Sequence, residues 1–198
     1  MTMARDTLAE LEDEALLVLY ANKDPDAARL LAHRLMPRLV GYAGRLLTDR
    51  AEAEDVAQET MLRLWKLAPD WRGGEAKVST WAYRVAQNLC TDRLRRRQRQ
   101  RATGLDDVAE PASDAATAVA GLIEADRMAA LDAALASLPE RQRSAVILRH
   151  IEGLTNTEIA EILQIGVEAV ESLTARGKRA LAAALAGQRA DLSYEEAE

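Results

Sequence analysis

A predicted helix that begins near residue 80 carries polar side chains at a spacing suited to nucleic acid. The positions i, i+4, i+8 and i+11 fall on one helical face, and they are occupied by Arg84, Asn88, Asp92 and Arg95. Guanidinium groups attract phosphates, whereas amide and carboxylate groups form hydrogen bonds with base edges. This mixture predicts a face that contacts both the backbone and the bases of DNA.

The same helix ends in 93-RLRRRQRQR-101, where six of nine residues are arginine although the chain has a formal net charge of −6. Arginines four positions apart on a helix repel one another, and this segment contains no acidic residue to relieve the repulsion. A polyanion would relieve it, so Arg93, Arg95 and Arg96 are predicted to join the DNA-binding face. A solvated charge run at a helix end is the plainer alternative.

Apolar residues on the other side of this helix predict how it packs. The expected buried stripe consists of Trp81, Val85 and Leu89, with Ala82, Ala86, Cys90 and Leu94 beside them. Core packing is therefore favoured for Trp81 over stacking on a base, and Cys90 is expected to be an inert core thiol. Tyr83 lies off this stripe, and its role stays open.

A face of different character is predicted on the helix that starts after Asp49. Its core stripe consists of Ala53, Val56, Ala57, Thr60, Met61, Leu64 and Leu67. A separate face is acidic with one apolar residue, and it consists of Asp55, Gln58, Glu59 and Leu62. An ordinary exposed face explains this pattern, but beside a basic DNA-binding helix it also fits a docking surface for a basic protein.

The C-terminal part of the sequence predicts a helix-turn-helix. The segment 155–163 opens with a T-x-x-E capping box, Thr155 and Glu158, and the turn 164-QIGV-167 separates it from a longer helix. The outer face of that helix consists of Glu168, Glu171, Ser172, Ala175, Arg176 and Arg179, with Lys178 at its edge. Such a helix enters the major groove, where Arg176 can bind a guanine edge. The predicted phosphate contacts are Arg141, Arg143, Arg149 and Lys178. A helical hairpin that serves only packing is the alternative.

The composition of the 198 residues favours the helices that these sites require. Ala, Leu, Arg and Glu are abundant, there are only five Pro and ten Gly, and no segment alternates as a strand does. Helices are expected over about 7–20, 25–47, 50–71 and 80–101, and then over 122–137, 139–152, 155–163 and 167–186. Asp24 is the expected cap of the second helix, and Ser79 or Thr80 that of the fourth. The predicted fold class is all-α.

Composition divides the chain into two small helical domains. Residues 102–121 are rich in Ala, Ser, Asp, Gly and Pro and have no long apolar face, which predicts a flexible acidic linker. The expected order is a four-helix domain at 1–101, this linker, a helix-turn-helix domain at 122–187 and an acidic tail at 188–198. Acidic residues are concentrated near the N-terminus, in the linker and in the tail, so charge segregation decides partner choice more than net charge does.

Several classes of protein are not supported. The single cysteine, Cys90, excludes an internal disulfide framework, and His33 and His150 are isolated, so neither a metal nor a cofactor is expected. The sequence has no His/Cys/carboxylate constellation and no glycine-rich phosphate loop, so no enzymatic activity is expected. Without a segment long and apolar enough to span a membrane and without a signal-peptide core, the protein is expected to be soluble and cytoplasmic.

Three blocks of sequence, 52–65, 79–97 and 138–181, closely resemble the bacterial extracytoplasmic-function (ECF) sigma factors of RNA polymerase, in that family's order and spacing. The resemblance implies a promoter-specificity subunit that binds core polymerase and promoter DNA. It assigns Asp55, Gln58, Glu59 and Leu62 to docking on the clamp helices of the largest polymerase subunit. The flap of the second-largest subunit is a further expected contact.

The resemblance also implies the DNA contacts. The melted −10 element is assigned to Arg84, Asn88, Asp92, Arg93, Arg95 and Arg96. The −35 duplex is assigned to Glu171, Ser172, Ala175, Arg176, Lys178 and Arg179. The loop 71–77 is implied to hold a flipped-out −10 base, and the acidic linker is implied to thread the channel near the polymerase active site. When free of polymerase, the chain is expected to be a monomer. An anti-sigma factor is expected as a further binding partner.

The sequence departs from the family's pattern at three glycine-related positions. Gln164 stands where the family often has Gly, and Gly166 stands where a capping Ser is common. Gly177 lies inside the recognition helix, where glycine costs about 1 kcal/mol relative to alanine. These departures bear on the turn geometry and hence on the base contacts.

Two other functions remain as alternatives to a sigma factor. An autonomous helix-turn-helix regulator that binds operators as a dimer would explain 139–186 but would leave the basic helix and the acidic linker without a use. A sigma-like decoy that sequesters an anti-sigma factor would not need the arginines of 93–101 or Arg176. Tight palindromic binding to duplex DNA without polymerase would favour the regulator.

Overall fold

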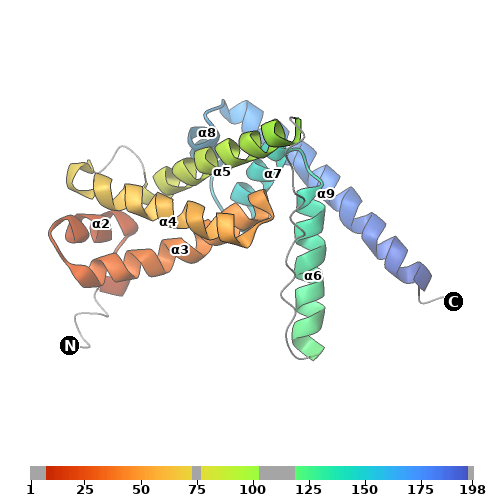
Figure 1. The fold of residues 1–198 in the computed structure, drawn as a ribbon, viewed down its shortest axis with the longest axis horizontal. Coiled ribbons are helices and arrows are strands. Elements are labelled where there is room, and N and C mark those ends of the chain that lie inside the picture. Colours follow the sequence, from red (N-terminus) through yellow and green to blue (C-terminus); the bar gives the residue numbers. More distant parts are fainter. Residues whose placement is uncertain (1–7, 73–76, 103–118, 196–198) are drawn as a thin grey trace. The chain divides into compact units, whose positions relative to one another are not determined.

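The computed structural model describes residues 8–72, 77–102 and 119–195, and these ranges contain helices and no strand (Figure 1). The chain forms two compact units. Helices α2 to α5 build the first unit, and α6, α7 and α9 frame the second, with α8 between α7 and α9 in the chain. The prediction of an all-α protein with two small helical domains is confirmed. The exact boundaries stay predictions, because most of the linker at 102–121 lies outside the described residues.

The long helix α3 (Pro25–Leu47) is the centre of the first unit, and it packs against α2, α4 and α5. It begins as the sequence predicts. The side chain of Asp24 accepts hydrogen bonds from the backbone N–H groups of Asp26, at 2.9 Å, and Ala27, at 3.2 Å. Pro25 occupies the first turn, where its missing N–H would have no partner in any case.

The predicted helix at 7–20 is interrupted, because Leu8 and Ala9 are helical, residues 10–12 are not, and α2 (Asp13–Ala21) begins after them. The carbonyl oxygens of Ala9 and Leu11 instead accept hydrogen bonds from the guanidinium of Arg34 on α3, at 2.6 and 2.7 Å. The same guanidinium lies 3.0 Å from the carboxylate of Asp13. A contact with α3 thus takes the carbonyls that a continuous helix would have used, and local propensity alone does not reveal it.

Helix α4 (Arg50–Leu67) starts with the predicted cap, since Asp49 Oδ1 accepts a hydrogen bond from the N–H of Glu52 at 2.9 Å. A short 3₁₀ turn follows at Ala68–Asp70. Helix α5 (Val78–Ala102) begins ahead of Ser79 and Thr80, so the prediction that one of these residues caps it is wrong. The N–H of Val78 is instead satisfied by Glu14 Oε1 on α2, at 2.7 Å.

The buried side of α5 is rotated relative to the predicted stripe. The buried positions are Val78, Thr80, Ala82, Tyr83, Ala86, Gln87 and Cys90, so burial of Ala82, Ala86 and Cys90 is confirmed. Trp81, Val85, Leu89 and Leu94 are only half-buried. Tyr83 packs edge-on against Tyr42 of α3, with ring centroids 5.3 Å apart. The Tyr42 hydroxyl donates a hydrogen bond to Gln87 Oε1, and Gln87 Nε2 donates to Thr91 Oγ1 at 2.9 Å. The period of the helix was predicted correctly, but its phase is set by Tyr42, a partner on another helix.

The C-terminal part of the chain contains α6 (Val119–Ala136), α7 (Glu140–Val146), α8 (Asn156–Leu163) and α9 (Val167–Glu195). The predicted single helix at 139–152 changes to a π-helical turn over Ile147–Ile151, and Gly153 ends it with a φ of 73°. Helix α9 continues to Glu195 rather than ending near 186, so the predicted tail at 188–198 is helical where it is described. The side chains at 119–126 and 187–195 lie outside the described part.

Candidate nucleic-acid and protein interfaces

The polar line predicted on α5 is present at the surface of the first unit. Its members are Arg84, Asn88, Asp92 and Arg95, and all four are exposed. At 100° per residue they lie within about 40° of Asn88 around the helix axis. The buried side chains of Tyr83 and Cys90 lie about 140° to 160° away. The line is therefore held outward by the packing of the opposite side.

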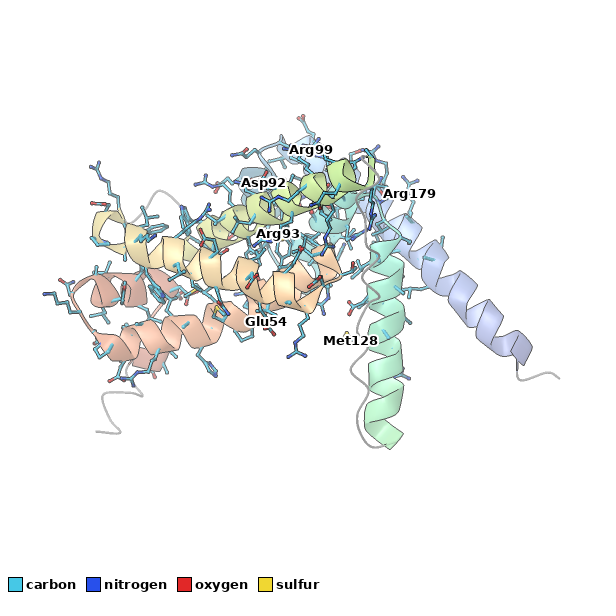
Figure 2. The ribbon with its side chains drawn as sticks, viewed as in Figure 1. Glu54, Asp92, Arg93, Arg99, Met128 and Arg179 are labelled. Atoms are coloured by element: carbon cyan, nitrogen blue, oxygen red, sulfur yellow. The ribbon has the colours of Figure 1, made fainter. Side chains whose placement is uncertain are left out.

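The predicted −10 residues do not all share this line. Arg96 is exposed about 80° from Asn88, and Arg93 is half-buried about 140° from it. Figure 2 shows Arg93 on the side of α5 toward α4 and Asp92 on another side. The six residues therefore form one line of four and two flanking arginines.

The acidic face predicted on α4 is also exposed. Asp55 and Gln58 are exposed, Glu59 is half-buried, and Leu62 has a relative exposure of 54% although it is apolar. Trp65 lies three positions beyond Leu62 on the same face, and its ring centroid is 4.4 Å from that of Tyr20 on α2. The i+3 spacing from Leu62 is the signal in the sequence that would have added Trp65 to this face.

The charge of Glu59 is stabilised by neighbouring basic groups. Arg63 donates a hydrogen bond to Glu59 Oε1 at 2.8 Å and is the main reason that the pKa of Glu59 lies below its usual value. The charges of Lys66 and Arg93 act in the same direction, while desolvation opposes them. Because Arg93 is on α5, the α4 face and the basic end of α5 are close enough to influence each other.

The capping box of the helix-turn-helix is formed as predicted. Glu158 Oε2 accepts hydrogen bonds from the backbone N–H and the hydroxyl of Thr155, both at 2.8 Å, and Thr155 Oγ1 accepts one from the N–H of Glu158 at 3.3 Å. Gln164 ends α8 in the left-handed region, with a φ of 54°. The N–H of Ile165 then donates to the carbonyl of Ala160 at 3.1 Å, as in a Schellman motif. Gln164 thus occupies the position where glycine is preferred.

The outer face of α9 has the predicted composition. The exposed side chains are Glu168, Glu171, Ser172, Ala175, Arg176, Lys178 and Arg179. Asn156 of α8 donates a hydrogen bond to Glu171 Oε1 at 3.4 Å. The exposed set is acidic in its first turns and basic farther along, so its two ends differ in the charge they offer to DNA.

Gly177 allows α7 and α9 to approach each other closely. A Cβ atom at this position would lie 2.5 Å from Val146 Cγ2 and 3.2 Å from the carbonyl oxygen of Gln142. Real Cβ atoms essentially never come within 3.0 Å of another heavy atom. The departure of the sequence at Gly177 is therefore explained by packing, which outweighs the lower helix propensity of glycine.

Two of the predicted phosphate contacts have backbone partners within the second unit. Arg143 is half-buried and donates from Nη2 to the carbonyl oxygens of Ala136 and Leu138, and burial lowers its pKa. Arg149 Nη1 donates to the carbonyl oxygen of Leu154 at 2.8 Å, across the turn at Gly153. These bonds hold the connections before α7 and α8, and the phosphate contacts of Arg143 and Arg149 stay predictions. Arg141 and Lys178 are exposed.

The described residues contain no group of three or more His, Cys, Asp or Glu side chains that could hold a metal ion. Their helices also include none that is both long and apolar enough to cross a membrane. Cys90 is buried, as predicted for a core thiol. Burial lowers the pKa of His150, and the nearby charges of Lys178 and Arg149 lower it further.

Comparison with known protein families assigns both units. Residues 31–100 match the family model described as Sigma-70 region 2, and residues 128–181 match that described as Sigma-70, region 4. A helical unit with region 2 followed by a helix-turn-helix unit with region 4 defines a sigma-70-type transcription initiation factor.

Similarity to individual proteins shows which group of sigma factors the chain resembles. The chain is 30% identical to the RNA polymerase sigma-H factor of Pseudomonas aeruginosa, over 90% of this chain and 96% of that protein. It is also 30% identical to the ECF RNA polymerase sigma factor SigW of Bacillus subtilis, over 80% of this chain and 88% of that protein. The chain belongs to the ECF sigma factors, so it directs core RNA polymerase to promoters and initiates transcription there.

Solved structures agree with the fold. The sigma factor RpoE of Bartonella quintana, in complex with the anti-sigma factor NepR, superposes with a TM-score of 0.66 at 23% identity, over 78% of this chain and 93% of that chain. The protein CnrH, in complex with the cytosolic domain of CnrY, gives a TM-score of 0.65 at 22% identity, over 88% of this chain and 97% of that chain.

Proposed function

We propose that the two units divide promoter recognition, with the first binding core polymerase and the melted −10 strand and the second reading the −35 duplex. The observation that carries this proposal is the exposed line of Arg84, Asn88, Asp92 and Arg95, which extends over about three turns of α5. A solvated helix face does not require amide and carboxylate groups between guanidinium groups. Base readout beside a phosphate backbone does.

On this line, the end residues and the middle residues have different tasks. Arg84 and Arg95 bind phosphates, whereas Asn88 and Asp92 form hydrogen bonds with base edges of the unpaired strand. Binding of flipped-out bases offsets their unstacking, which costs a few kcal/mol per base. The flanking arginines 93 and 96 add positive potential beside the strand. The loop at 71–77 is proposed to hold a flipped base, and residues 73–76 of it lie outside the described part.

In the second unit, α9 is proposed to enter the major groove of the −35 element. Arg176 binds a guanine edge in a bidentate manner, Glu171 accepts from a cytosine amino group, and Ser172 reaches a base or a phosphate. Ala175 leaves room for close approach, while Lys178 and Arg179 contact phosphates. The exposure of all these side chains supports the assignment.

The exposed face of α4 is proposed to bind the clamp helices of the largest polymerase subunit. Asp55, Gln58 and Glu59 provide acidic and polar contacts to a basic surface, and Leu62 provides an apolar contact at the centre. The second unit is proposed to contact the flap of the second-largest subunit. The protein has no catalytic activity of its own in this proposal, and it acts in the cytoplasm, where polymerase meets the chromosome.

Binding of an anti-sigma factor to the free monomer is also proposed. The structurally similar sigma factor RpoE of Bartonella quintana was solved with such a partner, NepR, which supports the idea. The acidic linker, of which 103–118 lie outside the described residues, is proposed to enter the polymerase channel.

Run-off transcription with purified core polymerase on the region upstream of the protein's own gene tests the proposal. We expect a defined transcript that requires both this protein and a −35 and −10 pair. Tight palindromic binding to duplex DNA in a gel shift without polymerase would instead support an autonomous dimeric regulator. Transcripts identical with and without the protein would refute the proposed function.

A further inference from the structure

Arg97, within the arginine-rich segment 93–101, is bound to other helices of its own unit. Its Nη1 donates a hydrogen bond to the carbonyl oxygen of Leu47 at 2.8 Å. Its Nη2 donates to Asp49 Oδ2 at 3.2 Å and lies 3.1 Å from Glu52 Oε2, as an ion pair. The side chain has a relative exposure of 28%, so solvent screens these contacts less than it would at an open surface.

The three acceptors all belong to the junction between α3 and α4. Leu47 is the last residue of α3, and its carbonyl is among those that a helix end leaves without an intrahelical partner. Thr48 follows in the left-handed region, with a φ of 54°. Asp49 is the N-cap of α4, and Glu52 lies in the first turn of that helix. A single guanidinium from α5 therefore holds the end of one helix and the start of the next.

The position of Arg97 along α5 gives this contact mechanical importance. Cys90 is the last fully buried residue of α5. Arg97 is half-buried, and the described residues after it, 98–102, are all exposed. Seven residues, about two turns, separate Cys90 from Arg97. Arg97 thus holds α5 against the α3–α4 junction about two turns beyond the last buried residue of the helix.

Arg97 also lies on the side of the helix opposite the polar line. It is nine residues beyond Asn88, which corresponds to about 180° around the axis. A side chain on that side fixes the direction in which Asp92 and Arg95 point, since these residues lie between the two fixed positions. Without the contact, a helix end rich in like charges would bend or fray.

We propose that Arg97 is a positioning residue for −10 recognition: it acts through the α3–α4 junction to hold the polar line of α5 straight, and it does not bind DNA. This inference rests on the proposed role of that line in reading the melted strand. On this proposal, the six arginines of 93–101 do not share one function, because Arg97 holds α5 in place within its own unit.

The two possible roles of Arg97 predict effects of opposite sign when its acidic partners are removed. If Arg97 bound a phosphate, neutral partners would release it and reduce local negative charge, so DNA binding would become tighter. If Arg97 is an anchor, neutral partners release the helix end, and DNA binding becomes weaker. The double variant D49N/E52Q makes this distinction, and asparagine preserves the N-cap because Asn and Asp are about equally good there.

The test uses holoenzymes assembled from core polymerase and each variant. Binding to a promoter whose −10 region is a preformed bubble is measured by fluorescence anisotropy over a range of salt concentrations, at a temperature where circular dichroism shows wild-type helix content. We expect R97M and D49N/E52Q each to weaken binding about three- to tenfold, the scale of 1 kcal/mol or slightly more. The triple variant D49N/E52Q/R97M should bind no more weakly than R97M alone, because all three residues act through one contact.

Salt dependence provides a matched control at the neighbouring arginine. Loss of one phosphate contact reduces the slope of log affinity against log salt by about 0.7 to 0.9. We expect R96M to show that change and R97M to keep the wild-type slope. Tighter binding by D49N/E52Q, a slope change in R97M equal to that in R96M, or wild-type binding by R97M would each overturn the proposal.

Two further measurements separate this inference from the proposed function. If N88A binds the bubble promoter as the wild type does, then the proposed reading by α5 fails, and the inference fails with it. If N88A binds weakly and R97M does not, only the anchor is refuted. Amide hydrogen exchange of the free protein reports on the contact directly, and we expect faster exchange over 94–102 in R97M than in R96M.

Discussion

Helices α5 and α9 are both proposed to contact DNA, but they distribute their charges differently. α5 carries its arginines toward its C-terminal end, including Arg99 and Arg101 in the last turn, where the negative end of the helix dipole stabilises cations. α9 begins with Glu168 in its first turn and carries Arg176 and Arg179 farther along. The last-turn arginines of α5 and the first-turn glutamate of α9 agree with the helix dipole.

The two helices are also held in place by different means. α5 is oriented by directional contacts, in which Tyr42 and Thr91 satisfy the buried amide of Gln87 and Tyr83 packs edge-on against Tyr42. α9 is set close to α7 by the absence of a side chain at Gly177. Directional contacts fix rotation about the helix axis, which matters for reading single unpaired bases. Close backbone approach fixes distance, which matters for the depth of a helix in a groove.

The largest effect is expected from a substitution in the first unit that prevents binding to core polymerase. Asp55→Lys places a positive charge on the acidic face of α4, where a basic partner surface is proposed. Like charges across an interface cost several kcal/mol, so core association should fall at least about a hundredfold. Glu54→Lys is the matched control, because Glu54 lies on the neighbouring part of α4 and forms only an exposed pair with Arg50. Co-purification of Asp55→Lys with core at the level of that control would disprove the docking assignment.

A larger residue at Gly177 tests whether the close approach of α9 to α7 stabilises the second unit. Gly177→Ala would place a Cβ atom 2.5 Å from Val146 Cγ2, and such overpacking costs about 1–3 kcal/mol, which exceeds the gain in helix propensity. Because the propensity gain offsets about 1 kcal/mol of this cost, we expect urea denaturation to show a second unit destabilised by about 1–2 kcal/mol. Gly166→Ala is the control, because a Cβ atom there meets nothing within 4 Å and only the weaker N-cap of alanine should lower the stability. Addition of Val146→Ala should recover part of the loss; equal stability of the two alanine variants would contradict the close approach.

Arg176→Ala examines base reading by α9. Loss of a bidentate contact with guanine costs about 1–3 kcal/mol, so transcription should fall about tenfold on the native −35 sequence. The effect should be small on a promoter with a scrambled −35 element, where that contact is already lost. Run-off assays on both templates give the comparison. An equal reduction on both would indicate that Arg176 binds a phosphate or supports the fold.

Asn88→Ala tests the corresponding role in α5, with an expected effect of about 1 kcal/mol, the scale of one hydrogen bond. Open-complex formation, measured by permanganate reactivity of the −10 region, should decrease more than core binding does. Gln98→Ala is a suitable control, since Gln98 is another exposed amide on the same helix. If both variants reduce permanganate reactivity alike, the line through Asn88 has no special part in opening the promoter.

The sequence predicts the repeating parts of these helices better than their fixed points. The exposure of Asn88 and Asp92 follows from helical period alone. The burial of Tyr83, the cap that Glu14 provides for Val78 and the anchoring of Arg97 do not, because each depends on a partner about forty or more residues away. A local pattern contains no record of such partners. Gly177 is intermediate, since its low helix propensity is visible in the sequence but the neighbouring Val146 is not.

The smallest effect concerns the turn that sets the start of α9. Gln164 has a φ of 54°, and an L residue in that region is strained by about 1–2 kcal/mol, whereas glycine is not. Glycine also gains flexibility in the unfolded chain, which removes part of the benefit. Gln164→Gly should therefore raise the stability of the second unit by only about 0.5 kcal/mol in urea denaturation. Gln164→Ala keeps the strain and should give no gain, so an equal increase in both variants would mean that the side chain of Gln164, and not its backbone, is the source of the strain.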